Sequence, residues 1–141
     1  MNWSTRYLGI PFAPLGRALT GCDCYGLACV VYQEELSITL PDYLGTYAST
    51  EEQGEIAALI AGAERLPMWV PVTGAATAFD LAVFRRGRLQ THVGIIVRRG
   101  LMLHVPADST SRIESYEAGQ WRHRLTGIWR HVDLISCGGR A

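Results

Sequence analysis

The chain has 141 residues and is 48% hydrophobic, which suits one compact domain with a substantial core, and we expect a single domain over residues 1–141. Its 13 basic side chains balance 13 acidic ones, so no net field favours nucleic acid or an anionic membrane as a partner. No signal peptide is visible, and no apolar stretch approaches the roughly 20 residues that span a bilayer. The sequence predicts a soluble protein, made in the cytoplasm, without nucleic-acid binding or membrane insertion.

The N-terminal part of the chain predicts an irregular arm followed by two helices. Residues 1–21 contain glycine and proline but little periodicity. Residues 23–36 form the first predicted helix, because Asp23 can cap its N-terminus and an apolar stripe follows at helical spacing. The stripe consists of Cys24, Leu27, Ala28 and Val31. Ser49 and Glu52 have capping-box spacing ahead of apolar residues that continue to residue 63, which predicts a second amphipathic helix.

The C-terminal half of the chain predicts strands joined by turns. Segments rich in β-branched and aromatic residues alternate with short polar turns such as "RGR" and "RG". The predicted strands are residues 80–85, 91–98, 101–105, 111–116 and 126–135. The first three form an antiparallel meander. Because the helices precede the strands instead of alternating with them, the predicted fold class is α+β, with N-terminal helices packed on a C-terminal antiparallel sheet.

The segment "GCDCYGL", residues 21–27, places a cysteine where a thiolate is favoured. A free cysteine is mostly protonated near pH 7, since its ordinary pKa is about 8.5. Cys24 lies in the first turn of the predicted helix, where unpaired backbone N–H groups favour negative charge, whereas Cys22 precedes the helix. Gly26 is expected to keep the space beside the thiol open. Cys24 is therefore the predicted nucleophile.

Two histidines are candidates for the base that a thiol nucleophile needs. His92 lies at the start of the strand "THVGIIV", and His104 lies near the end of the next strand, "LMLHV". The short turn between these strands makes them neighbours, so both rings can reach one region if they share a face. A cysteine, a base and a second polar residue that orients the base form a catalytic triad by role.

The remaining cysteines have less specific interpretations. Three cysteines within eight positions and no secretory signal indicate mostly reduced thiols. Zinc binding by Cys22 and Cys24, completed by Cys29 and a histidine, is an alternative, but structural zinc sites typically separate paired cysteines by about two to four residues. Cys29 is expected to be a small core residue, and Cys137 lies in a glycine-rich tail without an assigned role. No metal or cofactor is implied.

Four segments together resemble a known family. "DCYGL" at residues 23–27 looks like the nucleophile motif of the NlpC-type cysteine peptidases, papain-like enzymes that cut peptidoglycan stem peptides. "FDLAVFR", "HVGIIV" and "MLHV" are similar to the three following strands of these enzymes, in the same order and spacing. The resemblance covers about residues 7–131. "GCDCYGLACVVYQEELSITLPDY" and "WRHRLTGIWRH" look most like family members encoded with phage tails and gene-transfer particles.

The resemblance implies a role for each site residue. Cys24 would be the nucleophile, His92 the general base and acid, and His104 the residue that orients His92. The family stabilises the oxyanion with the backbone N–H of the nucleophile and an upstream tyrosine. Phe12 stands near the place of that tyrosine, and Tyr7 is the only tyrosine before Cys24. The further candidates for oxyanion or substrate binding are Tyr7 and Asp23.

The resemblance also implies a substrate and a setting. We expect a peptidase that hydrolyses amide bonds of peptidoglycan stem peptides, carried in a phage tail or tail-like particle and acting at the host cell wall. Its expected partners are stem peptides and the proteins of that particle. One alternative is a structural tail-assembly protein with the same fold and little or no catalysis. Another is an amidase or acyltransferase on the same scaffold, which would use the same nucleophile and base.

Overall fold

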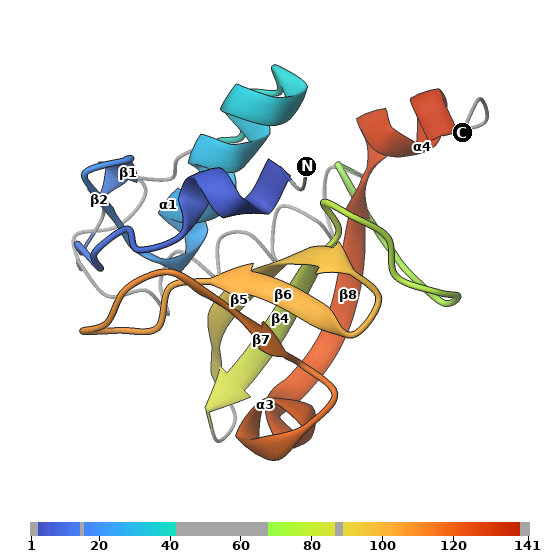
Figure 1. Cartoon of the computed structure of the whole chain (residues 1–141). Coiled ribbons are helices and arrows are strands. Elements are labelled where there is room, and N and C mark those ends of the chain that lie inside the picture. Colours follow the sequence, from blue (N-terminus) through green and yellow to red (C-terminus); the bar gives the residue numbers. More distant parts are fainter. Residues whose placement is uncertain (1–2, 15, 42–67, 87–88, 139–141) are drawn as a thin grey trace.

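The structure of the protein is a computed structural model that describes residues 3–14, 16–41, 68–86 and 89–138. The predicted helix at residues 49–63 lies outside the described residues. Figure 1 shows the arrangement of the elements. In chain order they are η1 (Trp3–Tyr7), β1 (Arg17–Ala18), β2 (Gly21–Cys22), α1 (Cys24–Val31), η2 (Tyr32–Leu36), β3 (Trp69–Pro71), β4 (Leu81–Arg86), β5 (Leu89–Arg98), β6 (Leu101–His104), β7 (Arg112–Ser115), α3 (Gly119–Arg124), β8 (Leu125–His131) and α4 (Val132–Gly138). No helix in the described ranges is long and apolar enough to cross a membrane.

A six-stranded antiparallel sheet forms the centre of the protein. Its strand order is β3-β8-β4-β5-β6-β7, so β4 to β7 form a meander and β8 returns to pair with β4. The meander predicted from the sequence is confirmed, with short connections from β4 to β5 and from β5 to β6. The sheet and the preceding helix α1 confirm the predicted α+β class.

Side chains on the strands alternate between two hydrophobic clusters, one on each face of the sheet. On β4, Leu81 and Val83 belong to the larger cluster, which also contains the buried residues of α1. Ala82 and Phe84 belong to the smaller cluster, together with Trp121 of α3. The larger cluster therefore lies between the sheet and α1, and the smaller one lies between the sheet and α3. Figure 1 shows these two helices on opposite sides of the sheet.

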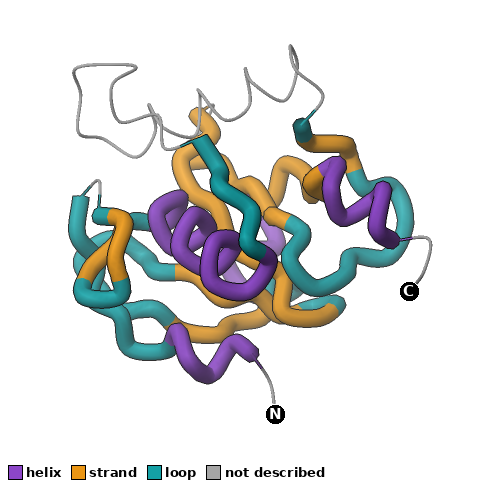
Figure 2. The backbone as a smooth tube through the Cα atoms, turned by 90° about the horizontal axis from the view of Figure 1, so that it is seen from above, coloured by secondary structure: helices purple, strands orange, loops and turns teal. Residues whose placement is uncertain are grey.

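Helix α1 is enclosed by the rest of the molecule. Seven of its eight residues are buried, so burial extends around the helix and is wider than the single apolar stripe predicted for residues 23–36. The helix continues through the π-helical turn η2 and ends at Ser37, whose φ of 55° is left-handed. The helix packs against β5 of the sheet and against β1 of the N-terminal arm. Figure 2, viewed from above, shows α1 lying across the strands.

The N-terminal arm is more regular than the predicted irregular segment. It contains η1, β1 and β2, and its backbone pairs with the connection between β6 and β7. The Gly9 N–H donates to the Ser111 carbonyl at 3.0 Å, and the Ser111 N–H donates to Ile10 at 2.8 Å. The Phe12 N–H donates to the Ser109 carbonyl at 2.8 Å. Local sequence patterns cannot reveal this pairing, because its two sides are about a hundred residues apart.

Three segments after residue 67 differ from the sequence prediction. The predicted strand at residues 126–135 is a strand, β8, only as far as His131, and Val132 begins α4. The Val132 N–H donates to the Met68 carbonyl at 2.8 Å, just past the last residue pair of the β3–β8 ladder. Helix α4 therefore begins where β8 loses its pairing with β3. The polar piece around Trp121 forms the short helix α3. The short strand β3 has no counterpart in the prediction.

The turn before β4 holds phenylalanine in a conformation that suits glycine. Phe79 has a φ of 74°, in the left-handed region that side chains disfavour. The Trp3 ring stacks on the Phe79 ring with centroids 4.5 Å apart, and the Tyr32 hydroxyl donates to the Phe79 carbonyl. The next residue, Asp80, is fully buried and accepts two hydrogen bonds of 2.8 Å from the Arg130 guanidinium. These contacts hold the turn against its local strain.

Candidate active site

Cys24 is the first residue of α1, and Asp23 caps the helix as the sequence predicts. The Asp23 Oδ1 atom accepts a hydrogen bond of 2.7 Å from the Gly26 N–H, which confirms the cap. The same oxygen accepts a 2.9 Å bond from the Arg17 guanidinium. Cys24 is 1% exposed and Asp23 is fully buried. These two hydrogen bonds mean that Asp23 fixes the start of the helix that carries the Cys24 thiol.

The structure gives a reason for glycine at position 26 that the sequence did not reveal. A Cβ atom on Gly26 would lie 1.9 Å from the Gly16 carbonyl oxygen and 2.9 Å from an Arg17 guanidinium nitrogen. Gly26 therefore admits the backbone of the N-terminal arm at a distance that no side chain permits. The close approach of the arm to Gly26 also places Arg17 beside Asp23, the residue that caps the helix.

Cys22 and Cys29 are the other two cysteines whose side chains the structure describes. Cys22 is fully buried, and burial, followed by the Asp23 charge, raises the pKa of its thiol to about 12. Cys29 is half-buried and packs against the larger hydrophobic cluster, so it lies at the edge of the core and not within it as predicted. No disulfide joins Cys22, Cys24 or Cys29 in the part of the chain that the structure describes. Among the described residues, no group of three or more metal-ligating side chains is close enough to hold an ion.

The two candidate histidines form one hydrogen-bonded pair. His92 lies opposite Phe84 in the ladder between β5 and β4, and His104 is the last residue of β6. The His92 Nε2 and His104 Nδ1 atoms are 2.7 Å apart, so the prediction that both rings share a face is confirmed. The strand that holds His92 begins at Leu89, which places this histidine within the strand and not at its start.

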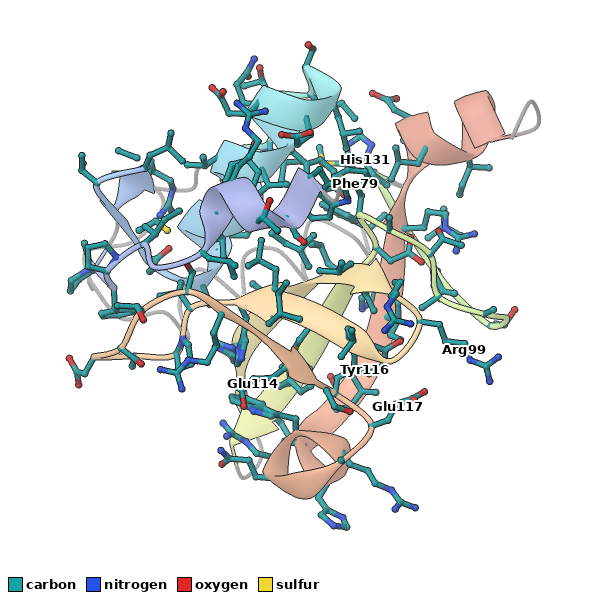
Figure 3. All side chains as sticks on the ribbon, in the orientation of Figure 1. Phe79, Arg99, Glu114, Tyr116, Glu117 and His131 are labelled. Carbon is teal, nitrogen blue, oxygen red and sulfur yellow. The ribbon has the colours of Figure 1, made fainter. Side chains whose placement is uncertain are left out.

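Sequence reasoning missed a third member of this network. The His104 Nε2 atom lies 2.7 Å from the Glu114 Oε2 atom on β7. His104 pairs with Arg112 in the β6–β7 ladder, so Glu114 is the diagonal neighbour on the same face. The available signal was the alternation in "RIES", but the long connection from β6 to β7 leaves the register undetermined. Figure 3 shows Glu114 toward α3, at the other end of the sheet from Phe79 and His131.

The indole of Trp121 covers both histidine rings. Its ring stacks on His92 with centroids 4.9 Å apart and an angle of 26° between the planes. It meets the His104 ring edge-on, also at 4.9 Å. Trp121 is 7% exposed, in agreement with a core or rim position. Together with Phe84, it makes the surroundings of the histidines apolar, and both imidazoles are almost completely shielded from water.

Burial keeps both imidazoles neutral near pH 7. Burial, followed by the nearby His104 and Arg124 charges, lowers the pKa of His92 well below its ordinary value of about 6.5. The pKa of His104 is also lowered, chiefly by burial, although Glu114 opposes this effect. A neutral imidazole can accept a proton, which is what a general base requires.

The start of α1 and the histidine strand are neighbours in the fold. Helix α1 packs against β5, and Cys24 and Val93 belong to the same hydrophobic cluster. Strand alternation puts Val93 under the flank of α1, whereas His92 points to the face of Phe84. The described contacts thus place Cys24 at the start of a helix that packs against the histidine strand, and the two histidines on the Phe84 face of the sheet.

Tyr7 lies away from the predicted oxyanion position. Its hydroxyl donates a 2.6 Å hydrogen bond to the Glu35 carboxylate in η2, the turn that follows α1. Burial and Glu35 raise the pKa of Tyr7, so the phenol keeps its proton. Glu35 follows Cys24 by a full helix length, so this geometry does not support Tyr7 as an oxyanion donor. Asp23, engaged by Gly26 and Arg17, has only acceptor atoms and does not support that role either.

We expect the folded protein to lose stability as the pH falls from about 7 to 5. Burial lowers the pKa values of His92, His104 and His131 below about 6.5, so in this range the unfolded chain binds more protons than the folded one. Each histidine contributes a slope of up to about 1.4 kcal/mol per pH unit. Urea unfolding at several pH values measures the slope. A free energy of unfolding that stayed constant or rose toward pH 5 would contradict the neutral, buried histidines, and His131→Gln should reduce the slope.

Comparison with known proteins agrees with this picture. The sheet, the enclosed helix and the buried histidine pair define a papain-like α+β protein. The family model described as "NlpC/P60 family" matches residues 9–130, which is most of the chain. The chain therefore belongs to the NlpC/P60 family. A search of curated protein sequences finds no significant match.

Solved structures of the same family share the fold. An NlpC/P60 family protein from Bacillus cereus has a TM-score of 0.66 and 20% identity, over 91% of this chain and 37% of that protein. The NlpC/p60 domain of the peptidoglycan hydrolase SagA has a TM-score of 0.60 and 20% identity, over 90% of this chain and 92% of that domain. NlpC2 from Trichomonas vaginalis has a TM-score of 0.60 and 17% identity, over 92% of this chain and 44% of that protein. The chain thus corresponds to less than half of the Bacillus and Trichomonas proteins.

Proposed function

We propose that the protein is a cysteine peptidase that hydrolyses amide bonds in the stem peptides of bacterial peptidoglycan. Two observations carry the proposal: Cys24 is the first residue of α1, a helix that packs against β5, and β5 holds His92, which forms a buried pair with His104. Membership of the NlpC/P60 family supports a cell-wall substrate. The description of SagA as a peptidoglycan hydrolase adds support, because its domain has the same fold and almost the same length.

In the proposed reaction, His92 transfers two protons, one in the acylation step and one in the hydrolysis step. The Nδ1 atom of His92 takes the proton from the Cys24 thiol, and the thiolate attacks the amide carbon. The tetrahedral intermediate collapses when His92 returns the proton to the leaving amine, which leaves a thioester on Cys24. His92 then takes a proton from water, whose oxygen attacks the thioester carbon. When the carbon–sulfur bond breaks and the acid is released, His92 gives this proton to the Cys24 sulfur, which restores the thiol and the neutral imidazole. Backbone N–H groups at the start of α1 would stabilise the oxyanion.

The bond and the setting rest on the resemblance of the sequence motifs. The bond expected for this family is the one that follows D-glutamate in the stem peptide. A phage tail or tail-like particle is the proposed carrier, made in the cytoplasm and acting at the host cell wall. Its support is the likeness of "GCDCYGLACVVYQEELSITLPDY" and "WRHRLTGIWRH" to tail-encoded family members. The partners would be stem peptides and the neighbouring proteins of the particle.

Digestion of purified peptidoglycan tests the proposed function. The reduced protein should release fragments whose masses correspond to cleavage of one amide bond, with a new free amine and no new reducing sugar. Activity should survive EDTA, because the nucleophile is a thiol. Loss of activity with EDTA and recovery with zinc would replace the thiolate mechanism with a metal-dependent one. The absence of any fragment from intact peptidoglycan and from isolated stem peptides would favour the structural tail-protein alternative.

The products also separate the peptidase from enzymes that share its nucleophile and base. A peptidase divides the stem peptide, whereas an amidase releases the whole stem from the glycan chain. An acyltransferase needs a second amine and joins it to the acyl group, which appears as a product heavier than the hydrolysis fragment. A product formed only in the presence of an added amine would exclude the proposed hydrolase.

A further inference from the structure

The histidine pair ends at Glu114, and this carboxylate determines where the protons of both rings lie. The chain of contacts runs from His92 Nε2 to His104 Nδ1 at 2.7 Å, and from His104 Nε2 to Glu114 Oε2 at 2.7 Å. Each neutral imidazole has one N–H group and one lone pair. The two contacts therefore admit only two proton arrangements, one the reverse of the other.

An ionised carboxylate selects one of these arrangements, because it can only accept. The His104 Nε2 atom must then carry a proton and donate it to Glu114. A neutral His104 keeps a lone pair at Nδ1, so the His92 Nε2 atom must donate to it. The remaining nitrogen of His92, Nδ1, is left with a lone pair. The reverse arrangement would put a proton on His92 Nδ1, and it would require a protonated Glu114.

We propose that Glu114 is a positioning residue that, through His104, holds His92 in the tautomer whose Nδ1 atom is free to accept the thiol proton. This inference rests on the proposed function of the site. Glu114 does not touch the reacting atoms. When His92 takes up the proton, its Nε2–H bond to His104 is kept, and the Glu114 carboxylate lies one ring away from the new positive charge. The same residue thus selects the resting tautomer and favours the charged intermediate.

The surroundings of the pair contain other charges, and Glu114 is the one that acts through a direct hydrogen bond. Arg112 on β7 and Arg124 at the end of α3 both oppose protonation of the histidines. Trp121 and Phe84 contribute apolar contacts only. Glu114 has a side chain that is 35% exposed, so its replacement does not leave a cavity in the core.

Histidine tautomers can be measured directly by two-bond ¹H–¹⁵N correlation spectra of the reduced protein near pH 7. Both His92 and His104 should appear as Nε2–H tautomers. In Glu114→Ala, water replaces the acceptor, the two arrangements become similar in energy, and His92 should show a mixture. Glu114→Gln should lie between them, because an amide oxygen can still accept from His104. Glu117→Gln, at another exposed glutamate just after β7, is the matched control and should match the parent spectrum.

Hydrolysis gives a second, separate readout. Glu114→Ala should lower kcat by about 10- to 100-fold with little change in KM, by analogy with carboxylates that orient metal-bound histidines through the same kind of hydrogen bond. The acid limb of the pH–kcat profile of Glu114→Ala should move to lower pH, because this variant lacks the carboxylate that raises the pKa of His104. An Nδ1–H tautomer of His92 in the parent protein would overturn the proposal, and so would unchanged tautomers in Glu114→Ala. If the parent protein does not hydrolyse peptides, the proposed function fails, while the spectra still decide the role of Glu114.

Discussion

Cys24→Ala should abolish peptide hydrolysis, with a fall of at least about 10³-fold, because nothing else in the site can form the acyl intermediate. His92→Gln should lower kcat by about 10²- to 10⁴-fold, the usual contribution of a general base. Both variants should stay folded. Cys24→Ala removes one sulfur atom from a buried position, and Gln at position 92 can still bond to His104. Steady-state kinetics on a stem peptide, with circular dichroism as the folding check, measure both effects.

Cys29→Ala provides the matched control for Cys24→Ala. Cys29 lies on the same helix and packs against the same cluster, so its replacement has a similar structural cost without touching the first turn. It should retain nearly full activity. Equal loss in Cys24→Ala and Cys29→Ala would show that the helix packing matters and not the thiol of Cys24. Full activity in His92→Gln would remove His92 from the role of base.

Gly26→Ala should destabilise the protein by about 3 kcal/mol, although alanine favours helix by about 1 kcal/mol. The added Cβ would lie 1.9 Å from the Gly16 carbonyl oxygen, and this neighbour is backbone that cannot rotate away. The arm must move, and the Arg17–Asp23 ion pair moves with it. Urea unfolding measures the change as a lower midpoint with a similar slope.

Gly74→Ala is the control for this prediction. A Cβ atom on Gly74 would meet no atom within 4 Å, so the same added methyl group should change stability by less than about 0.5 kcal/mol. If Gly26→Ala were as stable as the parent protein, the close approach of the arm to α1 would be wrong. Hydrolysis by Gly26→Ala should also fall, because displacement of the arm disturbs the cap beside Cys24.

The parts of the site that the sequence predicts are those set by local geometry. Asp23 caps the helix because its side chain reaches a backbone N–H three residues later. His92 and His104 could be paired from the sequence because a very short turn connects their strands and leaves little freedom in register. In both cases the partners are close along the chain, and standard helix or hairpin geometry determines the contact.

The parts that the sequence misses depend on distant partners. Glu114 reaches His104 only through the register of β6 and β7, and the connection over residues 105–111 does not determine that register. In the predicted strand at residues 126–135, apolar residues occur along the whole segment, between polar ones. Its last part nevertheless forms α4, because the neighbouring strand β3 ends there. The role of Gly26 depends on an arm whose path is decided by bonds to residues near 110.

The pairing of the N-terminal arm with the connection after β6 has a consequence for synthesis of the protein. The backbone partners of residues 9–12, at residues 109–111, leave the ribosome about a hundred residues after them. At typical rates of about 5–20 residues per second, the arm waits for several seconds before it can dock. Until then neither the arm nor His104 and Glu114 can complete the surroundings of the thiol. A nascent chain therefore carries Cys24 before the proposed site can be complete, and the proposed peptide cleavage would require synthesis to pass residue 114.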